Sequence, residues 1–348
     1  MRKISALIFL SLLITACTAA PASPAVTAPA VPSLIIPTPP ACTTILAEPT
    51  PGADTPSLFP AESEEDHVRG AEIPIMTIME YSDYQDLRSG LFAEVVDRLL
   101  EEHPDDVRVV SRIFPLISIN DKAALAAQAA QAAQEQGKFW EMHDLLYGGQ
   151  ENWVKLPVED FTQWIYAQAS ALEMNVDQFK VDLNRADIVA RIQQAWEDGQ
   201  KMGLPGTPLV LINGQIYAGP RDYSSLNDIL QLILLGKRQF TSCPLVTVQR
   251  NKQYIAALHT EKGDILIQLF ADKAPITVNS FIFLAHQGWY DDITFHRVIP
   301  DLFAQTGDPS GTGKGNPGYY IITEFDPTLK FNKPGRVAMV NSGPDTSG

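Results

Sequence analysis

The chain has 348 residues, with 26 Lys and Arg against 41 Asp and Glu, so its formal net charge is −15 at pH 7. Such an acidic balance argues against nucleic acid as a partner, because the phosphate backbone selects basic surfaces. It also disfavours electrostatic adhesion to anionic lipid, so any attachment to a membrane has to be covalent.

The N-terminus is typical of an export signal. Met1-Arg2-Lys3 is followed by an apolar run from Ile4 to Ile14, too short to span a bilayer, and then by Thr15-Ala16-Cys17. This end resembles a bacterial lipobox, so residues 1–17 are predicted to be a lipoprotein signal peptide, with Cys17 as the lipidated residue. Several acyl chains on Cys17 would anchor the protein to a membrane, outside the cytoplasm. An ordinary secretory signal with an incidental cysteine is the alternative.

Residues 18–70 are predicted to be a disordered spacer rich in Pro, Ala and Thr. Eleven of the 26 prolines of the chain lie here, together with the acidic run Glu62-Ser63-Glu64-Glu65-Asp66. This composition disfavours helix and sheet and supplies few apolar residues for a core, so we expect an extended, semi-rigid tether. In an oxidising compartment Cys42 could pair with Cys243; free or intermolecular thiols are equally compatible with the sequence.

Residues 71–240 alternate between strand and helix patterns. The predicted elements are a strand at 75–79, a helix at 92–100, a strand at 107–110, helices between 123 and 202, a hairpin at 209–217 and a helix at 223–235. This order implies an α/β domain with a mixed sheet and an inserted helical subdomain.

Three motifs in this region resemble the DsbA-like branch of the thioredoxin fold. They are Tyr81-Ser82-Asp83-Tyr84-Gln85, Gly137-Lys138-Phe139-Trp140 and Gly206-Thr207-Pro208-Leu209. The resemblance implies a cis peptide bond before Pro208 and a redox pair of cysteines at positions 86 and 89. Asp86 and Ser89 stand there instead, and neither side chain can attack a disulfide, so the domain is predicted to be redox-inert. Its role stays open between a peptide-binding edge at the cis-proline element and a spacer fold.

A linker at residues 241–252 leads to a predicted β-rich domain at residues 253–348. Its densest motif runs from Phe295-His296-Arg297-Val298-Ile299-Pro300 to Pro309, and a second motif begins about thirty residues later at Met339. The ordered match from about Tyr254 to Gly348 resembles a cyclophilin, a peptidyl-prolyl cis-trans isomerase. Because the chain stops within the second motif, the resemblance implies an incomplete all-β barrel, and we expect the natural protein to be longer.

The cyclophilin resemblance assigns roles residue by residue. It makes Arg297 the catalytic arginine and Gln305 the group that orients the substrate backbone. The apolar wall would come from Ile299, Leu302 and Phe303, and the residue before proline would be bound by Val340, Asn341 and Ser342. Three positions depart from the family pattern: Leu302 replaces Phe, Val340 replaces Ala and Thr306 replaces Gly. These departures would alter affinity and sequence preference more than the type of reaction.

The expected function is isomerisation of prolyl bonds in unfolded or exported polypeptides by a membrane-tethered lipoprotein. No cofactor is expected, because the reaction needs no covalent step. No metal is expected either, since His143, His286 and His296 lack partners at ligand spacing. The alternative is a non-catalytic peptide-binding or chaperone lipoprotein in which both domains hold clients. A barrel without its last strands has unpaired edges, so we expect the 348-residue chain to be a poor isomerase.

Overall fold

The structure is a computed structural model that describes residues 41–45 and 59–348. The predicted signal peptide, the predicted lipidation site Cys17 and most of the predicted spacer lie outside the described residues. Among the residues that are described, no helix is long and apolar enough to cross a membrane.

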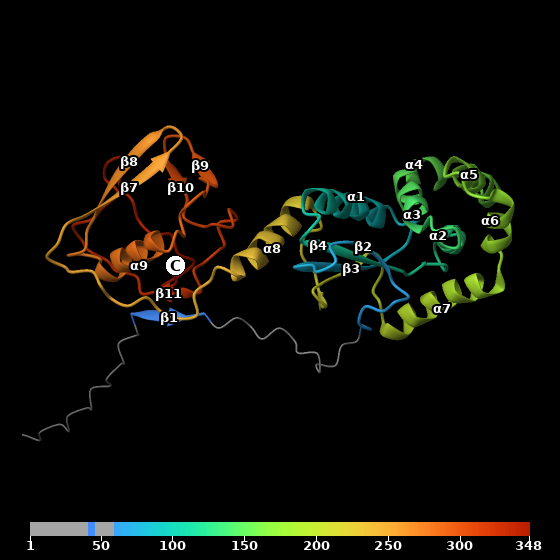
Figure 1. The fold of residues 1–348 in the computed structure, drawn as a ribbon, viewed down its shortest axis with the longest axis horizontal. Helices are drawn as coiled ribbons and strands as arrows, with labels where there is room; N and C mark the ends of the chain where they lie inside the picture. Colours follow the sequence, from blue (N-terminus) through green and yellow to red (C-terminus); the bar gives the residue numbers. More distant parts are fainter. Residues whose placement is uncertain (1–40, 46–58) are drawn as a thin grey trace, which may run out of the picture. The chain divides into compact units, whose positions relative to one another are not determined.

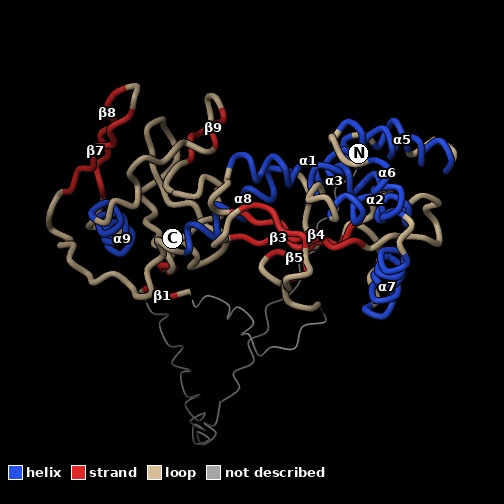
Figure 2. The backbone as a smooth tube through the Cα atoms, turned by 45° about the vertical axis from the view of Figure 1, so that its right-hand side comes forward, coloured by secondary structure: helices blue, strands red, loops and turns tan. Residues whose placement is uncertain are grey.

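A five-stranded mixed sheet organises the region between residues 59 and 236 (Figures 1 and 2). Its strand order is β2-β4-β3-β5-β6, and only the β3–β4 pair is parallel. The strands are β2 (His67–Gly70), β3 (Met76–Ser82), β4 (Val107–Ile113), β5 (Leu209–Ile212) and β6 (Gln215–Ile216). The inner strands β3 and β5 are almost fully buried, which explains why apolar residues follow one another in them without regular alternation.

Helices cover both faces of this sheet. On one face, Ile78 belongs to a cluster that includes Phe92 of α1 (Leu87–Glu102) and Leu230 of α8 (Tyr223–Gly236). Met79 lies on the opposite face, in a cluster that includes Trp196 of α7 (Ala186–Met202). The change of face between neighbouring residues follows from the two-residue period of a strand.

A helical subdomain is inserted between β4 and β5, as the sequence predicts. Its helices, followed by α7, are α2 (Ala123–Gln134), α3 (Phe139–Gly148), α4 (Gln150–Trp153), α5 (Val158–Ala171) and α6 (Val176–Leu183). Trp153, Phe161 and Phe179 are fully buried in its core. The alanines of α2 are buried against α3, α6 and α7, because their short side chains let these helices approach closely.

The folded region begins earlier than the predicted boundary at residue 71. Strand β2 pairs with β4, and the acidic run before it is ion-paired to the same strand: Asp66 lies 2.7 Å from Arg112, and Glu62 lies 3.1 Å from Arg108. The sequence alone suggests that the acidic run is exposed to solvent, because the arginines that pair with it are 46 residues later in the chain. The prediction that the spacer extends to residue 70 is therefore corrected.

A second part of the predicted spacer is also ordered. Strand β1 (Cys42–Thr44) pairs antiparallel with β11 (Tyr319–Ile321), with Cys42 opposite Ile321. The sulfur atoms of Cys42 and Cys243 are bonded at 2.13 Å. Residues 42–44 therefore belong to the C-terminal β-rich region, although the sequence places them in the tether.

The C-terminal region consists of separate two-stranded ladders around one helix. Its remaining elements are β7 (Tyr254–Thr260), β8 (Gly263–Leu269), α9 (Pro275–His286), β9 (Arg297–Ile299) and β10 (Phe303–Gln305). Pairs form between β7 and β8, between β9 and β10, and between β1 and β11, so the described residues contain no closed barrel. The predicted β-rich character is present, but α9 means that the region is not all-β.

The core of this region includes a residue of the predicted linker and the residue just before it. Leu284, Trp289 and Tyr319 are buried, and Phe240 and Cys243 pack against them. The side chain of Asn279 accepts a hydrogen bond from the backbone N–H of Thr247 at 2.8 Å and donates one to the carbonyl of Leu245 at 3.0 Å. The linker is therefore attached to α9 rather than free.

Candidate functional site

The β9–β10 hairpin brings four of the predicted site residues to one face. In its register Gln305 lies opposite Arg297, and Phe303 lies opposite Ile299. Because side chains alternate along a strand and opposite residues share a face, all four side chains project to the same side. The turn between the strands holds Asp301 at a φ of +61°, a conformation that Asp tolerates better than most residues.

The guanidinium group of Arg297 is available to a ligand. Its central carbon lies 5.1 Å from the centre of the Phe303 ring, so the charge lies over an aromatic face. Arg297 is exposed, and no carboxylate of the described residues lies within ion-pair distance of it. All its N–H donors can therefore meet an acceptor that approaches the hairpin.

The remaining predicted pocket residues are not part of this strand face. Leu302 is in the turn and is 73% exposed. Val340 is 61% exposed, and the segment that contains Asn341 and Ser342 is attached elsewhere, through the Ser342 N–H to Thr346 and a bridge between Ser347 and Ile321. Within the described residues, no recorded hydrogen bond or ring contact joins residues 340–342 to the hairpin. The binding roles of these residues stay predictions.

A carboxylate that the sequence reasoning missed orders the loop beside the hairpin. Asp308 accepts hydrogen bonds from the N–H and hydroxyl of Ser310 and from the N–H of Gly315, at 2.6–2.9 Å. Burial opposes ionisation of Asp308, but these bonds and one from the backbone of Gly313 hold its pKa below the usual value. An Asp followed two and four residues later by Ser and Thr is a local signal for such a loop.

A second site lies where α1 begins. Asp86 is the N-cap of α1, and its carboxylate accepts hydrogen bonds from the hydroxyls of Ser89 at 3.2 Å and Thr207 at 2.8 Å. The Thr207–Pro208 peptide bond is cis. The structure thus brings Asp86, Ser89 and Pro208 together, as the resemblance implies, with a carboxylate and a hydroxyl where thiols would stand.

Polar groups are buried behind this second site. Glu80 on β3 is 2% exposed, and burial raises its pKa to about 7. The hydroxyls of Ser111 and Ser82 donate hydrogen bonds of 3.5 Å to its carboxylate, which lower the pKa by less than burial raises it. His143 is also buried; its Nδ1 lies 2.9 Å from Asp144, and its Nε2 has no hydrogen-bond partner. Burial lowers the pKa of His143, so the ring stays neutral near pH 7. The described residues contain no group of three or more ligands that would hold a metal ion.

Comparison with known families separates the two regions. Residues 255–348 match the family described as cyclophilin type peptidyl-prolyl cis-trans isomerase. This part of the chain is therefore similar to the cyclophilin-type isomerases. Residues 62–231 match a thioredoxin family, which agrees with the sheet and inserted helices described above. The match begins close to the acidic run that is ion-paired to β4, and so supports the earlier boundary.

A protein similar to the C-terminal region is peptidyl-prolyl cis-trans isomerase A of Mycobacterium tuberculosis. It is 44% identical over 124 residues, which are 31% of this chain and 64% of that protein. The protein of Mycobacterium leprae is 43% identical over 30% of this chain and 66% of its own length. The chain therefore spans just under two thirds of the length of these two isomerases.

The thioredoxin-like region is similar to part of a longer protein and to most of two solved chains. The Na⁺/H⁺ antiporter NhaA 3 of Salinispora tropica is 34% identical over 170 residues, 49% of this chain and only 25% of that protein. Among solved structures, α-DsbA1 of Wolbachia pipientis is 18% identical with a TM-score of 0.44, covering 51% of this chain and 94% of that chain. A thioredoxin-like oxidoreductase from Silicibacter pomeroyi is 25% identical with a TM-score of 0.40, covering 48% and 90% of the respective chains.

Proposed function

We propose that the protein is a peptidyl-prolyl cis-trans isomerase that acts on exported or unfolded polypeptides outside the cytoplasm. The observation that carries this proposal is the face of the β9–β10 hairpin, where Arg297 and Gln305 lie opposite each other beside Phe303 and Ile299. The match of residues 255–348 to the cyclophilin family supports it.

The chemistry requires a group that stabilises a twisted amide. A prolyl bond isomerises slowly because twisting it breaks amide resonance, at a barrier of about 18–20 kcal/mol. In the twisted state the prolyl nitrogen becomes pyramidal and can accept a hydrogen bond, which a guanidinium N–H of Arg297 would donate. A charge-assisted hydrogen bond is worth roughly 1.5–3 kcal/mol, or on the order of 10- to 150-fold in rate. Orientation of the substrate by Gln305 and exclusion of water by apolar residues would supply more.

The disulfide supports a location outside the cytoplasm. Cys42 and Cys243 are bonded in the structure, and such bonds persist in oxidising compartments. The sequence adds a predicted export signal and Cys17 as the proposed lipid anchor. Residues 18–40 would then separate the anchor from β1, which is part of the C-terminal region.

A non-catalytic, peptide-binding lipoprotein is the second candidate. It is favoured by the site at the start of α1, which retains the cis-proline element but holds Asp86 and Ser89 in place of thiols. The departures from the family pattern at Leu302 and Val340, two residues that the resemblance assigns to the substrate pocket, favour it as well.

A protease-coupled isomerisation assay on the natural full-length protein distinguishes the two candidates. Arg297→Ala is expected to lower kcat/KM by at least 10-fold, whereas Arg250→Ala, a change at an exposed linker arginine, should leave it unchanged. Equal turnover by both variants would reject Arg297 as the catalytic group. A folded parent without activity would favour the binding lipoprotein.

A further inference from the structure

The β9–β10 hairpin is too short to be stable by itself. Each strand contributes three residues to the ladder, and only Ile299 and Gln305 among the six are partly buried. A two-stranded ladder of this kind is marginally stable in water without support from the rest of the fold. The orientation of Arg297 and Gln305 therefore depends on contacts at the base of the hairpin, the end opposite the Asp301 turn.

Thr306, the residue after β10, makes one of these contacts. Its hydroxyl donates a hydrogen bond of 2.8 Å to the backbone carbonyl of Thr294, three residues before β9 begins. The ladder ends at the pair of Arg297 and Gln305, so this bond joins the two chain segments just beyond the last pair of strand residues. It closes the base of the hairpin where backbone pairing has stopped.

The two residues that follow attach the same segment to buried groups. The carbonyl of Gly307 accepts a hydrogen bond of 3.1 Å from the indole N–H of Trp289, which is 3% exposed. Asp308 is buried too, and its carboxylate accepts a bond from the N–H of Gly315 at the far end of the loop. The segment that carries Thr306 is therefore fixed, and its hydroxyl holds the segment before β9 against it.

The loop ordered by Asp308 returns to the hairpin at Gly313. A Cβ on Gly313 would stand 3.3 Å from Nε2 of His296 and 4.0 Å from the side-chain nitrogen of Gln305, so the loop backbone packs beside both residues. Both ring nitrogens of His296 are buried without a hydrogen-bond partner. The side chain of His296 therefore makes no hydrogen bond that would fix the next residue, Arg297.

The hydroxyl of Thr306 departs from the cyclophilin pattern, which usually has Gly at this position. Glycine has no side-chain donor, so a chain with Gly here could not make the bond to the carbonyl of Thr294. Because the hydroxyl donates to the protein's own backbone, it is not offered to a substrate. Its effect on the site would pass through the hairpin.

We propose that Thr306 is a positioning residue, which closes the base of the hairpin and thereby keeps Arg297 and Gln305 in the orientation that the twisted amide requires. This inference rests on the proposed isomerase function and deepens it. A mobile guanidinium would have to be ordered in the transition state, which raises the barrier, whereas a donor already in place does not.

The protease-coupled isomerisation assay on the natural full-length protein tests the effect on catalysis. Thr306→Val removes the hydroxyl, keeps the side-chain shape and should lower kcat by roughly 2- to 12-fold, the range of one neutral hydrogen bond, with KM little changed. Thr306→Ala should reproduce this loss, and Thr306→Ser, which keeps the hydroxyl, should restore most of kcat. Thr260→Val is the matched control, because it removes a hydroxyl that bonds the carbonyl of Gly263 at 2.7 Å in the β7–β8 turn.

Hydrogen exchange of residues 297–305, followed by mass spectrometry, tests the hairpin without reference to activity. Thr306→Val and Thr306→Ala should speed exchange by about the same factor as they lower kcat, because opening of the hairpin is what the bond opposes. Thr306→Ser and Thr260→Val should exchange at the parental rate.

Three outcomes would overturn the proposal. Parental kcat in Thr306→Val, with or without faster exchange, would show that the hydroxyl does not position the site. Equal loss of kcat in Thr306→Val and Thr306→Ser would assign the effect to side-chain shape. Parental activity in Arg297→Ala would reject the proposed function and with it the positioning role, and faster exchange in Thr306→Val would then distinguish this failure from a hairpin that the bond does not hold.

Discussion

The carboxylate of Asp86 accepts a hydrogen bond of 2.8 Å from the hydroxyl of Thr207, a residue 121 positions later in the chain. Asp86 begins α1, and Thr207 precedes the cis-proline Pro208 at the start of β5. The bond therefore joins the helix to the loop that faces it, at the place where the resemblance to DsbA implies a cysteine.

Asp86→Ala is expected to destabilise the thioredoxin-like region by about 1–2 kcal/mol, because it removes the N-cap of α1 and leaves the Thr207 hydroxyl without its acceptor. Urea unfolding followed by tryptophan fluorescence measures the change. Asp86→Asn is the matched control and should cost much less, since Asn also caps helices and retains an acceptor oxygen. An alanine variant as stable as the parent would show that the contact contributes nothing.

The parent should not reduce disulfides through this site, whereas Asp86→Cys combined with Ser89→Cys should create a reactive pair. Both positions lie at the N-terminus of α1, where the helix dipole lowers the pKa of a thiol and favours the thiolate. Insulin reduction with dithiothreitol measures the activity, and Ser89→Cys alone is the control. An inert double variant would contradict the view that the lack of two thiols is what keeps this site redox-inert.

Glu80→Gln should stabilise the protein at high pH and have less effect at low pH. Burial raises the pKa of Glu80 from 4.5 to about 7, so between these pH values the folded state keeps a proton that the unfolded chain has released. The contribution of this group is therefore complete below pH 4.5 and is lost as pH rises through 7. The gain from the substitution should be larger at pH 8 than at pH 5 by about 2–3 kcal/mol.

Thermal unfolding of the parent and the Glu80→Gln variant across pH 5–8 gives this difference. Glu94→Gln, at an exposed position of α1, is the control and should show no trend with pH. Parallel stability profiles for Glu80→Gln and the parent would contradict a buried, protonated Glu80.

The secondary structure that follows from the local spacing of apolar residues could be predicted from the sequence. The strands, the Ala-rich helix and the hairpin after residue 209 follow from apolar spacing, and the cis peptide bond at Pro208 follows from the family motif. The prediction also chose Arg297 and Gln305, and the strand register places these two side chains opposite each other.

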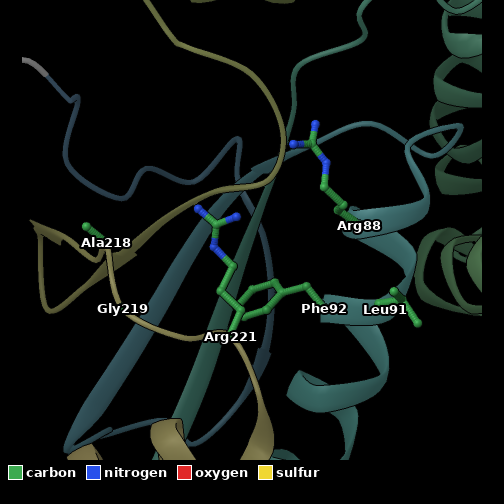
Figure 3. A pocket seen from close by; sticks show the side chains of 6 residues that line it. All are labelled: Arg88, Leu91, Phe92, Ala218, Gly219 and Arg221. Carbon is green, nitrogen blue, oxygen red and sulfur yellow. The ribbon is translucent and has the colours of Figure 1, made fainter.

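Three features could not be predicted from the sequence, because each depends on contacts between segments that are far apart in the chain. Strand β1 is three residues long within a proline-rich stretch and becomes a strand only because β11 is beside it. Glu62 and Asp66 form ion pairs with arginines of β4. The residues next to them in the sequence therefore do not indicate that this segment is folded. Arg88 and Arg221 lie on different elements, and only the fold brings them to one pocket (Figure 3).

The bond between Cys42 and Cys243 should stabilise the C-terminal region by about 2–4 kcal/mol, because it restricts the unfolded chain over a sequence separation of 201 residues and holds β1 against β11. Reduction of the parent should therefore lower the melting temperature and speed hydrogen exchange at the backbone N–H of Ile322, which donates a hydrogen bond of 3.2 Å to the carbonyl of Ala41, the residue before β1. Cys42→Ser combined with Cys243→Ser should match the reduced parent and show no response to reductant. If the oxidised and reduced parent melt alike, β1 is held by its backbone pairing alone, and the disulfide is dispensable for the fold.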